Sequence, residues 1–303
     1  MRNAISTSTT CDVGGAANAN PELKPDKHSP GVYFLGAGAV FVCMICGFPL
    51  LSCKHKINKE ERKMILITGD IHGSHDIHKL SNKGNPDFKD IFNNMTKDDY
   101  VIICGDFGLV WNNDKEDMWW RSWLNDRPFT TLFVDGNHEN FDLLNAYPVE
   151  NWHGGKIHRI APSIIHLMRG QLFDIEGKSF FTMGGAESHD REFRTIGISI
   201  WEQELPNNKE YAQALSTLEK CEYKADYVIT HCAPTDIEYE VEHGKCTSAY
   251  NFYYSENRLT EFFRDLADKM QYERWFCGHY HCDYVSKLNP KFEILYDKIV
   301  TLP

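Results

Sequence analysis

Five short apolar runs, each followed at once by residues that can bind a metal ion, constrain this chain more than any other feature. The first run leads into Gly69-Asp70-Ile71-His72, the second into Gly105-Asp106 and the third into Gly136-Asn137-His138-Glu139. The fourth ends on His231, and the fifth leads into Gly278-His279-Tyr280-His281. A short apolar run bounded by a turn signal is typical of a buried strand. Five such endings in one chain favour a shared functional site over five unrelated polar turns.

The first run, residues 64–68, indicates how such a site forms. In open α/β sheets, sites lie beyond the carboxyl ends of the strands. Residues i and i+2 of an extended chain point the same way, so Asp70 and His72 can reach one point. The flanking glycines let the chain turn sharply and leave the mouth of the site uncrowded. Taken alone, this stretch reads equally well as a polar turn after a strand.

The ordered set of motifs resembles that of the calcineurin-like metallophosphoesterases over residues 64–303. The resemblance implies an α/β fold, a two-layered β-sandwich flanked by helices, with a dinuclear metal centre at the strand ends. It also implies that His138 protonates the leaving oxygen of the substrate. Position by position, it implies two ligand sets that share one bridging carboxylate: Asp70, His72, Asp106 and His281 for one ion, and Asp106, Asn137, His231 and His279 for the other.

The residue types fit this chemistry without the resemblance. Two divalent cations about 3.5–4 Å apart can hold a phosphate group and activate a water molecule as the nucleophile near neutral pH. A shared carboxylate fixes the separation of the two ions, and Asp106 is the best-placed candidate. A mixed shell of Asp, Asn and His suits Mn²⁺, Fe²⁺ or Zn²⁺ better than Mg²⁺. We therefore expect two divalent metal ions, Mn²⁺ first, with Fe²⁺ or Zn²⁺ as alternatives.

Two departures from related motifs narrow the expected activity. Purple acid phosphatases place a tyrosine three residues after the bridging aspartate, where this chain has Leu109. Phosphoprotein phosphatases and diadenosine tetraphosphate hydrolases carry an Asp-Arg pair shortly after that aspartate, and residues 106–111 contain no arginine. A phosphoprotein phosphatase therefore remains an alternative rather than the first choice.

Residues 184–206 are the candidate for binding the remaining charge of the substrate. This polar, glycine-containing segment supplies His189, Arg191 and Arg194. The planar guanidinium group of arginine suits phosphate. Bacterial and phage metallophosphoesterases of unassigned substrate have a similar segment. The alternative is that both arginines pair with the neighbouring acidic residues at positions 187, 190 and 192.

The charge of the chain favours a small substrate. Residues 64–303 hold 24 of the 32 basic and 38 of the 43 acidic residues, a net charge of −14. Such acidity works against long nucleic acids, whose binding depends on neutralising phosphates. We expect a small or nucleotide-like phosphoester as substrate, with a nuclease of the same superfamily as an alternative. A non-catalytic binding module is less favoured because every ligand position is filled, and no partner protein can be inferred.

Two segments have apolar residues at helical spacing, which predicts buried helix faces. Residues 257–271 present Leu259, Phe262, Phe263, Leu266 and Met270 in this way. A helix over residues 116–125 presents Trp119, Trp120 and Trp123. We expect all of these side chains in the core, although one tryptophan could line the site.

Cysteines lie in or beside the predicted strand ends, at positions 104, 232, 277 and 282, without paired Cys-x-x-Cys spacing. Buried reduced thiols are the simplest interpretation, and they fit a cytoplasmic protein.

The first 63 residues differ in composition from the rest. Residues 1–28 are rich in Ser, Thr, Asn, Ala and Pro, which is typical of disorder. Residues 29–53 carry no charge and are long enough to cross a bilayer once. The basic residues of a linker over 54–63 would keep the catalytic domain, residues 64–303, in the cytoplasm. The other interpretation is that residues 1–63 are upstream sequence joined to an enzyme that starts at Met64.

Overall fold

The computed structural model describes residues 63–244 and 257–303. They belong to a compact unit, Lys59–Pro303, and a second unit, Met1–Asn58, lies outside the described residues. The expectations for residues 1–28 and 29–53 therefore fall outside the described part, as does the linker up to residue 62. Within the described part, no helix has both the length and the apolar character needed to cross a membrane.

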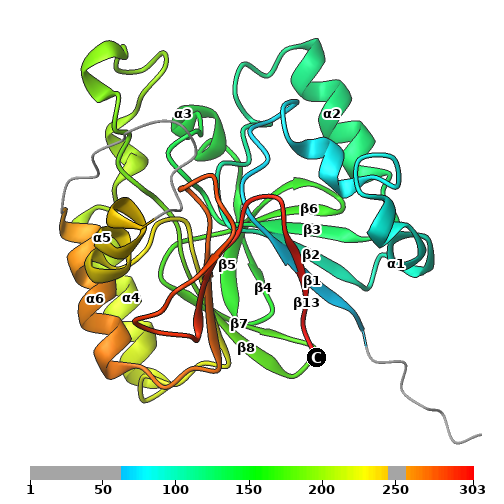
Figure 1. Ribbon diagram of the computed structural model, residues 1–303. Coiled ribbons are helices and arrows are strands. Elements are labelled where there is room, and N and C mark those ends of the chain that lie inside the picture. Colours follow the sequence, from blue (N-terminus) through cyan, green and yellow to red (C-terminus); the bar gives the residue numbers. More distant parts are fainter. Residues whose placement is uncertain (1–62, 245–256) are drawn as a thin grey trace, which may run out of the picture. The chain divides into compact units, whose positions relative to one another are not determined.

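Two mixed β-sheets form the centre of the described unit (Figure 1). The first sheet has, in spatial order, β13 (Ile299–Thr301), β1 (Ile65–Thr68), β2 (Tyr100–Ile103), β3 (Thr130–Phe133), β6 (Ile164–Leu167), β5 (Gly155–Ala161) and β4 (Val149–Trp152). The second has β11 (Tyr284–Val285), β12 (Phe292–Ile294), β10 (Arg274–Cys277), β9 (Tyr227–Thr230), β8 (Lys178–Met183) and β7 (Gln171–Ile175).

Side chains along the central strands alternate between two apolar layers, because successive residues of a strand point to opposite faces. In β1, Ile65 and Ile67 pack into the layer between the two sheets, whereas Leu66 faces the outer helices. In β9, Ile229 belongs to the layer between the sheets and Val228 to the opposite face. Both faces of each central strand are therefore buried, which explains why these strands read as continuous apolar runs.

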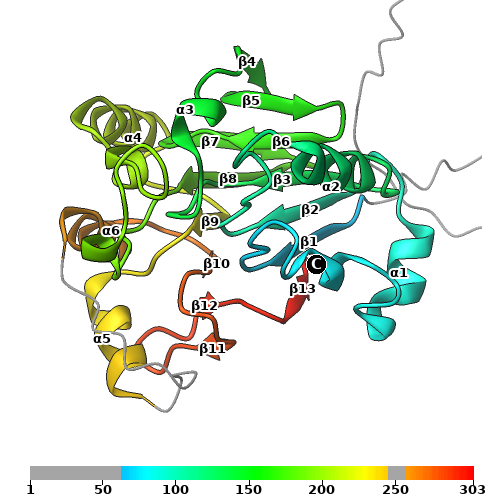
Figure 2. The same cartoon turned by 90° about the horizontal axis from the view of Figure 1, so that it is seen from above.

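Helices cover the outer face of each sheet. They are α1 (Lys89–Asn94), α2 (Lys115–Asn125), α3 (Phe141–Leu144), α4 (Asn208–Lys220), α5 (Thr235–His243) and α6 (Arg258–Lys269). Helices α1 and α2 lie against the first sheet, and α4, α5 and α6 lie against the second (Figure 2). The predicted α/β fold, a two-layered β-sandwich flanked by helices, is confirmed.

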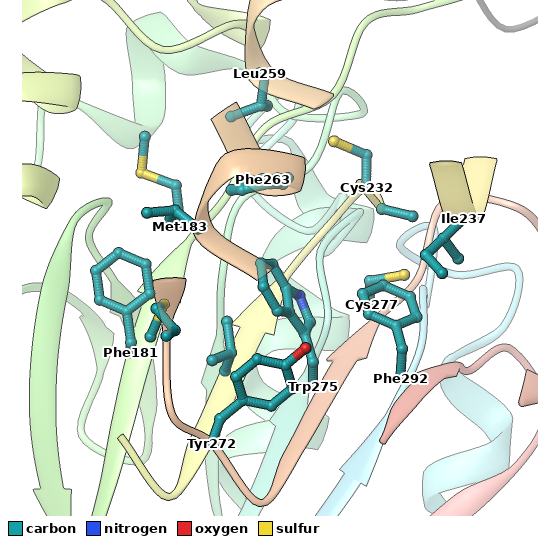
Figure 3. Packing of buried hydrophobic residues seen from close by; sticks show 14 of the residues in the cluster. Phe181, Met183, Cys232, Ile237, Leu259, Phe263, Tyr272, Trp275, Cys277 and Phe292 are labelled. Carbon is teal, nitrogen blue, oxygen red and sulfur yellow. The ribbon is translucent and has the colours of Figure 1, made fainter. Parts of the chain in front are cut away.

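Helix α6 illustrates how the sequence produces one of these outer layers. Asn257 caps the helix by accepting hydrogen bonds from the backbone of Leu259 and Thr260, which satisfies N–H groups that lack a helical partner. Phe263 then projects from α6 toward Trp275 of β10 (Figure 3). The predicted core of this helix is confirmed, since its apolar stripe is buried or partly buried against the second sheet.

Helix α2 departs from its prediction at one residue. Trp120 and Trp123 pack against the core of the first sheet, as expected, but Trp119 is 57% exposed. At about 100° per residue the three tryptophans span about 100° of the helix, with Trp119 and Trp120 at the two ends of that arc. The side chains buried along this helix, Asp117, Arg121 and Leu124, lie beyond the Trp120 end, so Trp119 faces solvent.

The cysteines agree with prediction at three of the four positions. Cys104, Cys232 and Cys277 are buried free thiols. The expectation was wrong for Cys282, which is disulfide-bonded.

Parallel pairing brings the predicted site residues to one edge of the sandwich. Strands β1, β2 and β3 run parallel in the first sheet, and β9 and β10 run parallel in the second. Their carboxyl ends therefore face the same way within each sheet. The loops after these five strands carry the motifs identified in the sequence.

Candidate metal centre

Imidazole and carboxylate groups from both sheets meet at this edge. Five of the side chains there are buried: Asp70, Asp106, Asn137, His231 and His279. The ring of His72 is mostly covered, whereas His281 is exposed and opens the cluster to solvent.

The first set of side chains converges around His72. Nδ1 of His72 lies 2.9 Å from Oδ2 of Asp76, so this nitrogen donates its hydrogen to the carboxylate. In the neutral ring, Nε2 then carries a lone pair, and it faces Oδ2 of Asp106 at 3.2 Å and Nε2 of His281 at 3.3 Å. Ligand atoms of Asp70, His72, Asp106 and His281 all lie within 4.8 Å of one another.

The second set converges around His231 in the same way. Nδ1 of His231 donates to the carbonyl oxygen of Cys104 at 2.7 Å, which leaves a lone pair on Nε2 of the neutral ring. That nitrogen faces Oδ1 of Asp106 at 3.2 Å and Oδ1 of Asn137 at 3.1 Å. Each oxygen of Asp106 is therefore directed toward a different histidine.

Converging lone pairs repel one another unless a cation or a proton lies between them. Burial lowers the pKa of His72, but its hydrogen bonds with Asp106 and Asp76 outweigh burial and raise the pKa to about 10. Burial likewise lowers the pKa of His231, and Asp106 raises it to about 9. A proton thus occupies each position in the metal-free protein. Imidazole nitrogen with carboxylate and amide oxygen is also a donor set that suits Mn²⁺, Fe²⁺ or Zn²⁺, so the residues fit two such ions.

The remaining predicted residues lie beside these sets. His279 is buried with its ring 5.0 Å from that of His231, and burial keeps its pKa well below the usual range, so the ring is neutral. The backbone N–H of His279 donates to both oxygens of Asp70, at 3.1 and 3.0 Å. The backbone N–H of His138 donates to Oδ1 of Asp106 at 2.8 Å, and its ring lies 5.3 Å from that of His72. Their individual roles stay predictions.

Glycines before the ligands allow the motifs to press against one another. A Cβ on Gly105 would lie 2.1 Å from Nδ1 of His231, and one on Gly136 would lie 2.1 Å from Oδ1 of Asp106. A Cβ on Gly278 would lie 1.9 Å from Oδ1 of Asp70. Close approach is therefore the main reason for these glycines, in addition to the sharp turn expected from the sequence.

Four site residues have left-handed backbone conformations. His72, Asp106, His279 and His281 have φ values of 41°, 47°, 71° and 49°. Such values are uncommon for residues with a Cβ and cost on the order of 1–3 kcal/mol each. The surrounding fold holds these residues in conformations that aim their side chains into one volume.

Three further residues support the site: Asp76 and Lys79 were not identified from the sequence, and Glu139 belonged to the third motif without an assigned role. Asp76 orients His72, and its spacing of four residues is the one signal that could have found it. Glu139 is buried and accepts hydrogen bonds from the backbone N–H groups of Phe107 and Gly108, at 2.7 and 3.2 Å. Lys79 is buried and donates to the carbonyl oxygen of Asp70 at 2.5 Å. The third motif contains Glu139 but does not predict its supporting role, and nothing in the local sequence distinguishes Lys79.

The predicted substrate-binding residues lie on the His279 side of the centre. His189 and Arg191 line a pocket of about 250 Å³ together with His279. Arg194 pairs with Asp190 at 2.6 Å, which is the alternative expected from the sequence, although its charge also helps to lower the pKa of His138. A contact of these residues with a substrate stays a prediction.

A larger pocket of about 640 Å³ opens on the opposite side, beside His72, His138 and His281. Aromatic and acidic side chains line much of it, including Trp111, Trp120, Tyr296, Asp114 and Glu116. Trp120 is thus the tryptophan of α2 that lines the site. Among the described residues that line this pocket there is no lysine or arginine.

Known proteins resemble this chain to different degrees. A search of curated proteins finds no match. The solved structure of the sulfate thiohydrolase SoxB of Thermus thermophilus, in complex with glycerol, is similar over 78% of this chain and 51% of that chain, with 11% identity and a TM-score of 0.33. The present chain thus spans about half the length of that protein. The family model for calcineurin-like phosphoesterases matches residues 63–283. With its five motif-bearing strand ends inside that range, the chain belongs to the calcineurin-like phosphoesterase family.

Proposed function

We propose that this protein hydrolyses a small phosphoester with the help of two divalent metal ions, Mn²⁺ first. The observation that supports this most directly is the position of Asp106, whose two oxygens face His72 and His231 at 3.2 Å each. A carboxylate shared in this way suits two ions better than one. The donors that face Asp106 from both sides also argue against a binding module that has lost its chemistry.

When bound, two such cations supply positive charge to the phosphate group and lower the pKa of the water that attacks it. The described residues would hold the two ions and donate the proton to the leaving group. Asp106 would hold the two sets together, and the buried carboxylate of Asp70 and the amide of Asn137 would complete one set each. His138 lies beside the first set and lines the larger pocket, where it would donate a proton to the departing oxygen.

The larger pocket supports an uncharged or cationic leaving group. Beyond the histidines next to the centre, its described lining has aromatic rings and carboxylates but no lysine or arginine, so a chain of further phosphates would meet carboxylates there. This favours a compact phosphoester, or a nucleoside part bound through its base, over a nuclease substrate or a polyphosphate. We place the catalytic unit in the cytoplasm, as the sequence predicts.

A substrate panel with defined metal content tests the proposal. The metal-free protein would be loaded with Mn²⁺, Zn²⁺, Fe²⁺ or Mg²⁺ and assayed with p-nitrophenyl phosphate, its bis-ester, cyclic nucleotides and single-stranded DNA. We expect about two bound ions in the active protein, loss of activity on chelation and no cleavage of DNA. One ion or none in fully active protein would contradict a dinuclear centre.

Two asparagine variants separate a bridging carboxylate from an ordinary ligand. Asp106→Asn should weaken both sites, because each oxygen faces its own set, whereas Asp70→Asn should chiefly weaken the first. Loss of an outer-shell residue typically costs about 10–100-fold in metal affinity or activity, and loss of a shared ligand should cost more. Two tightly bound ions in Asp106→Asn would show that this residue does not bridge.

A further inference from the structure

The side-chain amide of Asn137 can face the proposed metal site in either of two orientations. An amide presents an oxygen and a nitrogen of nearly equal size, and only the oxygen can bind a divalent cation. A rotation of the amide by 180° would turn two N–H donors toward the cation. Asn137 is only 3% exposed, so hydrogen bonds with neighbouring protein groups, and not with bulk water, determine which orientation is stable.

Ser188 is the neighbour that faces the amide nitrogen. Nδ2 of Asn137 donates to Oγ of Ser188 at 3.2 Å, while Oδ1 lies 3.1 Å from Nε2 of His231. Ser188 follows β8 in the segment 184–206 and is 2% exposed. Its hydroxyl can donate one hydrogen bond and accept two, so the direction of its hydrogen decides which end of the amide it attracts.

Glu204 sets that direction. Oε2 of Glu204 accepts a hydrogen bond from the backbone N–H of Ser188 at 3.3 Å, and the Ser188 hydroxyl donates to the same carboxyl group. With its hydrogen committed to Glu204, the hydroxyl offers only lone pairs to Asn137. The amide must then present its N–H group to Ser188 and its oxygen to the metal centre.

The Ser188 hydroxyl donates its hydrogen bond to Glu204 whether or not Glu204 carries a proton. Glu204 is completely buried, and burial raises its pKa to about 7 in spite of the hydrogen bonds from Ser188. Among the described residues, Oε1 of Glu204 has no hydrogen-bond partner. A proton would therefore reside on Oε1, and Oε2 would continue to accept from Ser188.

We propose that Ser188 and Glu204 are positioning residues that orient the Asn137 amide with Oδ1 toward the second metal ion. The inference rests on the proposed role of Asn137 as a metal ligand. Each residue acts through the next: Glu204 orients the hydroxyl of Ser188, and Ser188 orients the amide of Asn137.

The test measures Mn²⁺ binding to the full chain by calorimetric titration, with electron paramagnetic resonance to distinguish a single ion from a coupled pair. Ser188→Ala should weaken the second site by about 10–100-fold and leave the first unchanged. Ser188→Thr keeps the hydroxyl and should restore binding. Glu204→Gln should bind like the original chain, because the N–H of Ser188 selects the Gln oxygen, whereas Glu204→Met should behave like Ser188→Ala.

Controls separate this role from a general packing effect. Ser163→Ala removes the hydroxyl of another buried serine, just before β6 at the opposite edge of the sheet, and should leave both sites unchanged. Equal weakening of both sites in Ser188→Ala, or no recovery in Ser188→Thr, would overturn the proposal. The proposal would also be overturned if Ser188→Ala bound both ions as tightly as the original chain while Asn137→Ala lost the second ion. Unchanged binding in Asn137→Ala would instead reject Asn137 as a ligand and overturn this inference, while the metal count of the active protein tests the dinuclear centre separately.

Discussion

His138 and Asn137 are adjacent in the chain but face different chemistry. Asn137 turns into the second set, whereas His138 lines the larger pocket beside His72. Burial lowers the pKa of His138, and Arg194 lowers it further, while Asp106 raises it. The ring is therefore largely neutral in the metal-free protein, and an anionic phosphate next to it would favour the protonated form that a general acid needs.

Replacement of His138 tests whether this residue acts as a general acid or only positions the phosphate. General acid catalysis is worth typically about 10²–10⁴-fold, so His138→Gln should lower turnover of an alkyl phosphate by that order with the metal content intact. The loss should be smaller for p-nitrophenyl phosphate, whose leaving group hardly needs a proton. Equal losses for the two substrates in steady-state assays would reject the acid role.

Metal affinity should rise with pH because each ion must displace a proton. In the metal-free protein the pKa of His72 is about 10 and that of His231 about 9, both above the ordinary value of 6.5. Protonation of these rings therefore stabilises the metal-free fold fully below about pH 6.5, and this contribution is lost as the pH rises through 9 to 10. Titrations at pH 6.5, 7.5 and 8.5 should show Mn²⁺ binding tightening by up to about tenfold per unit at each site, with proton release. Affinity independent of pH would contradict these assignments.

Among the elements, the strand ends were the most predictable part of this molecule and the supporting residues the least. A strand such as residues 65–68 can be recognised in the sequence as a continuous apolar run because both of its faces are buried. Asp70 and His72 follow such a run directly, so their place at the sheet edge could be predicted. Ser188 and Glu204 could not, since their importance comes from contacts across the fold and not from any local pattern. The prediction that Trp119 is buried was wrong because helical spacing identifies an apolar face of a helix but not how much of that face packs against the core.

The glycine before the fifth motif offers a test at the level of the element. Gly278→Ala would place a Cβ 1.9 Å from Oδ1 of Asp70, so the loops after β10 and β1 must separate. We expect weaker Mn²⁺ binding at the first site and a lower melting temperature. Gly177→Ala is the matched control, because its φ of +72° brings strain but nothing lies within 4 Å of the added Cβ. It should lose stability only, and a similar loss of metal in both variants would contradict the explanation.

At the scale of the whole molecule, every predicted ligand and supporting residue belongs to the unit Lys59–Pro303. The two sheets share one apolar layer, and the metal centre lies where the strands of both sheets end. The family match begins at residue 63, within the same unit.

Removal of residues 1–58 should therefore leave the chemistry intact. We expect the shortened chain to bind two Mn²⁺ ions and to hydrolyse a soluble phosphoester with an unchanged kcat/KM. Parallel metal analysis and steady-state kinetics of both chains provide the measurement. Loss of metal on truncation would mean that the N-terminal residues take part in the site, whatever their relation to a membrane.

The contact of Gly105 with His231 and of Gly278 with Asp70 has a consequence for how the protein matures. Each contact joins segments separated by more than 100 residues in the chain. Local folding cannot form such contacts early, because closing long loops costs entropy before any interaction repays it. The ion-binding volume should therefore come into existence late, once both sheets have docked. Newly made chains would then acquire their ions as the final event of folding, and a shortage of metal should yield a folded but inactive protein.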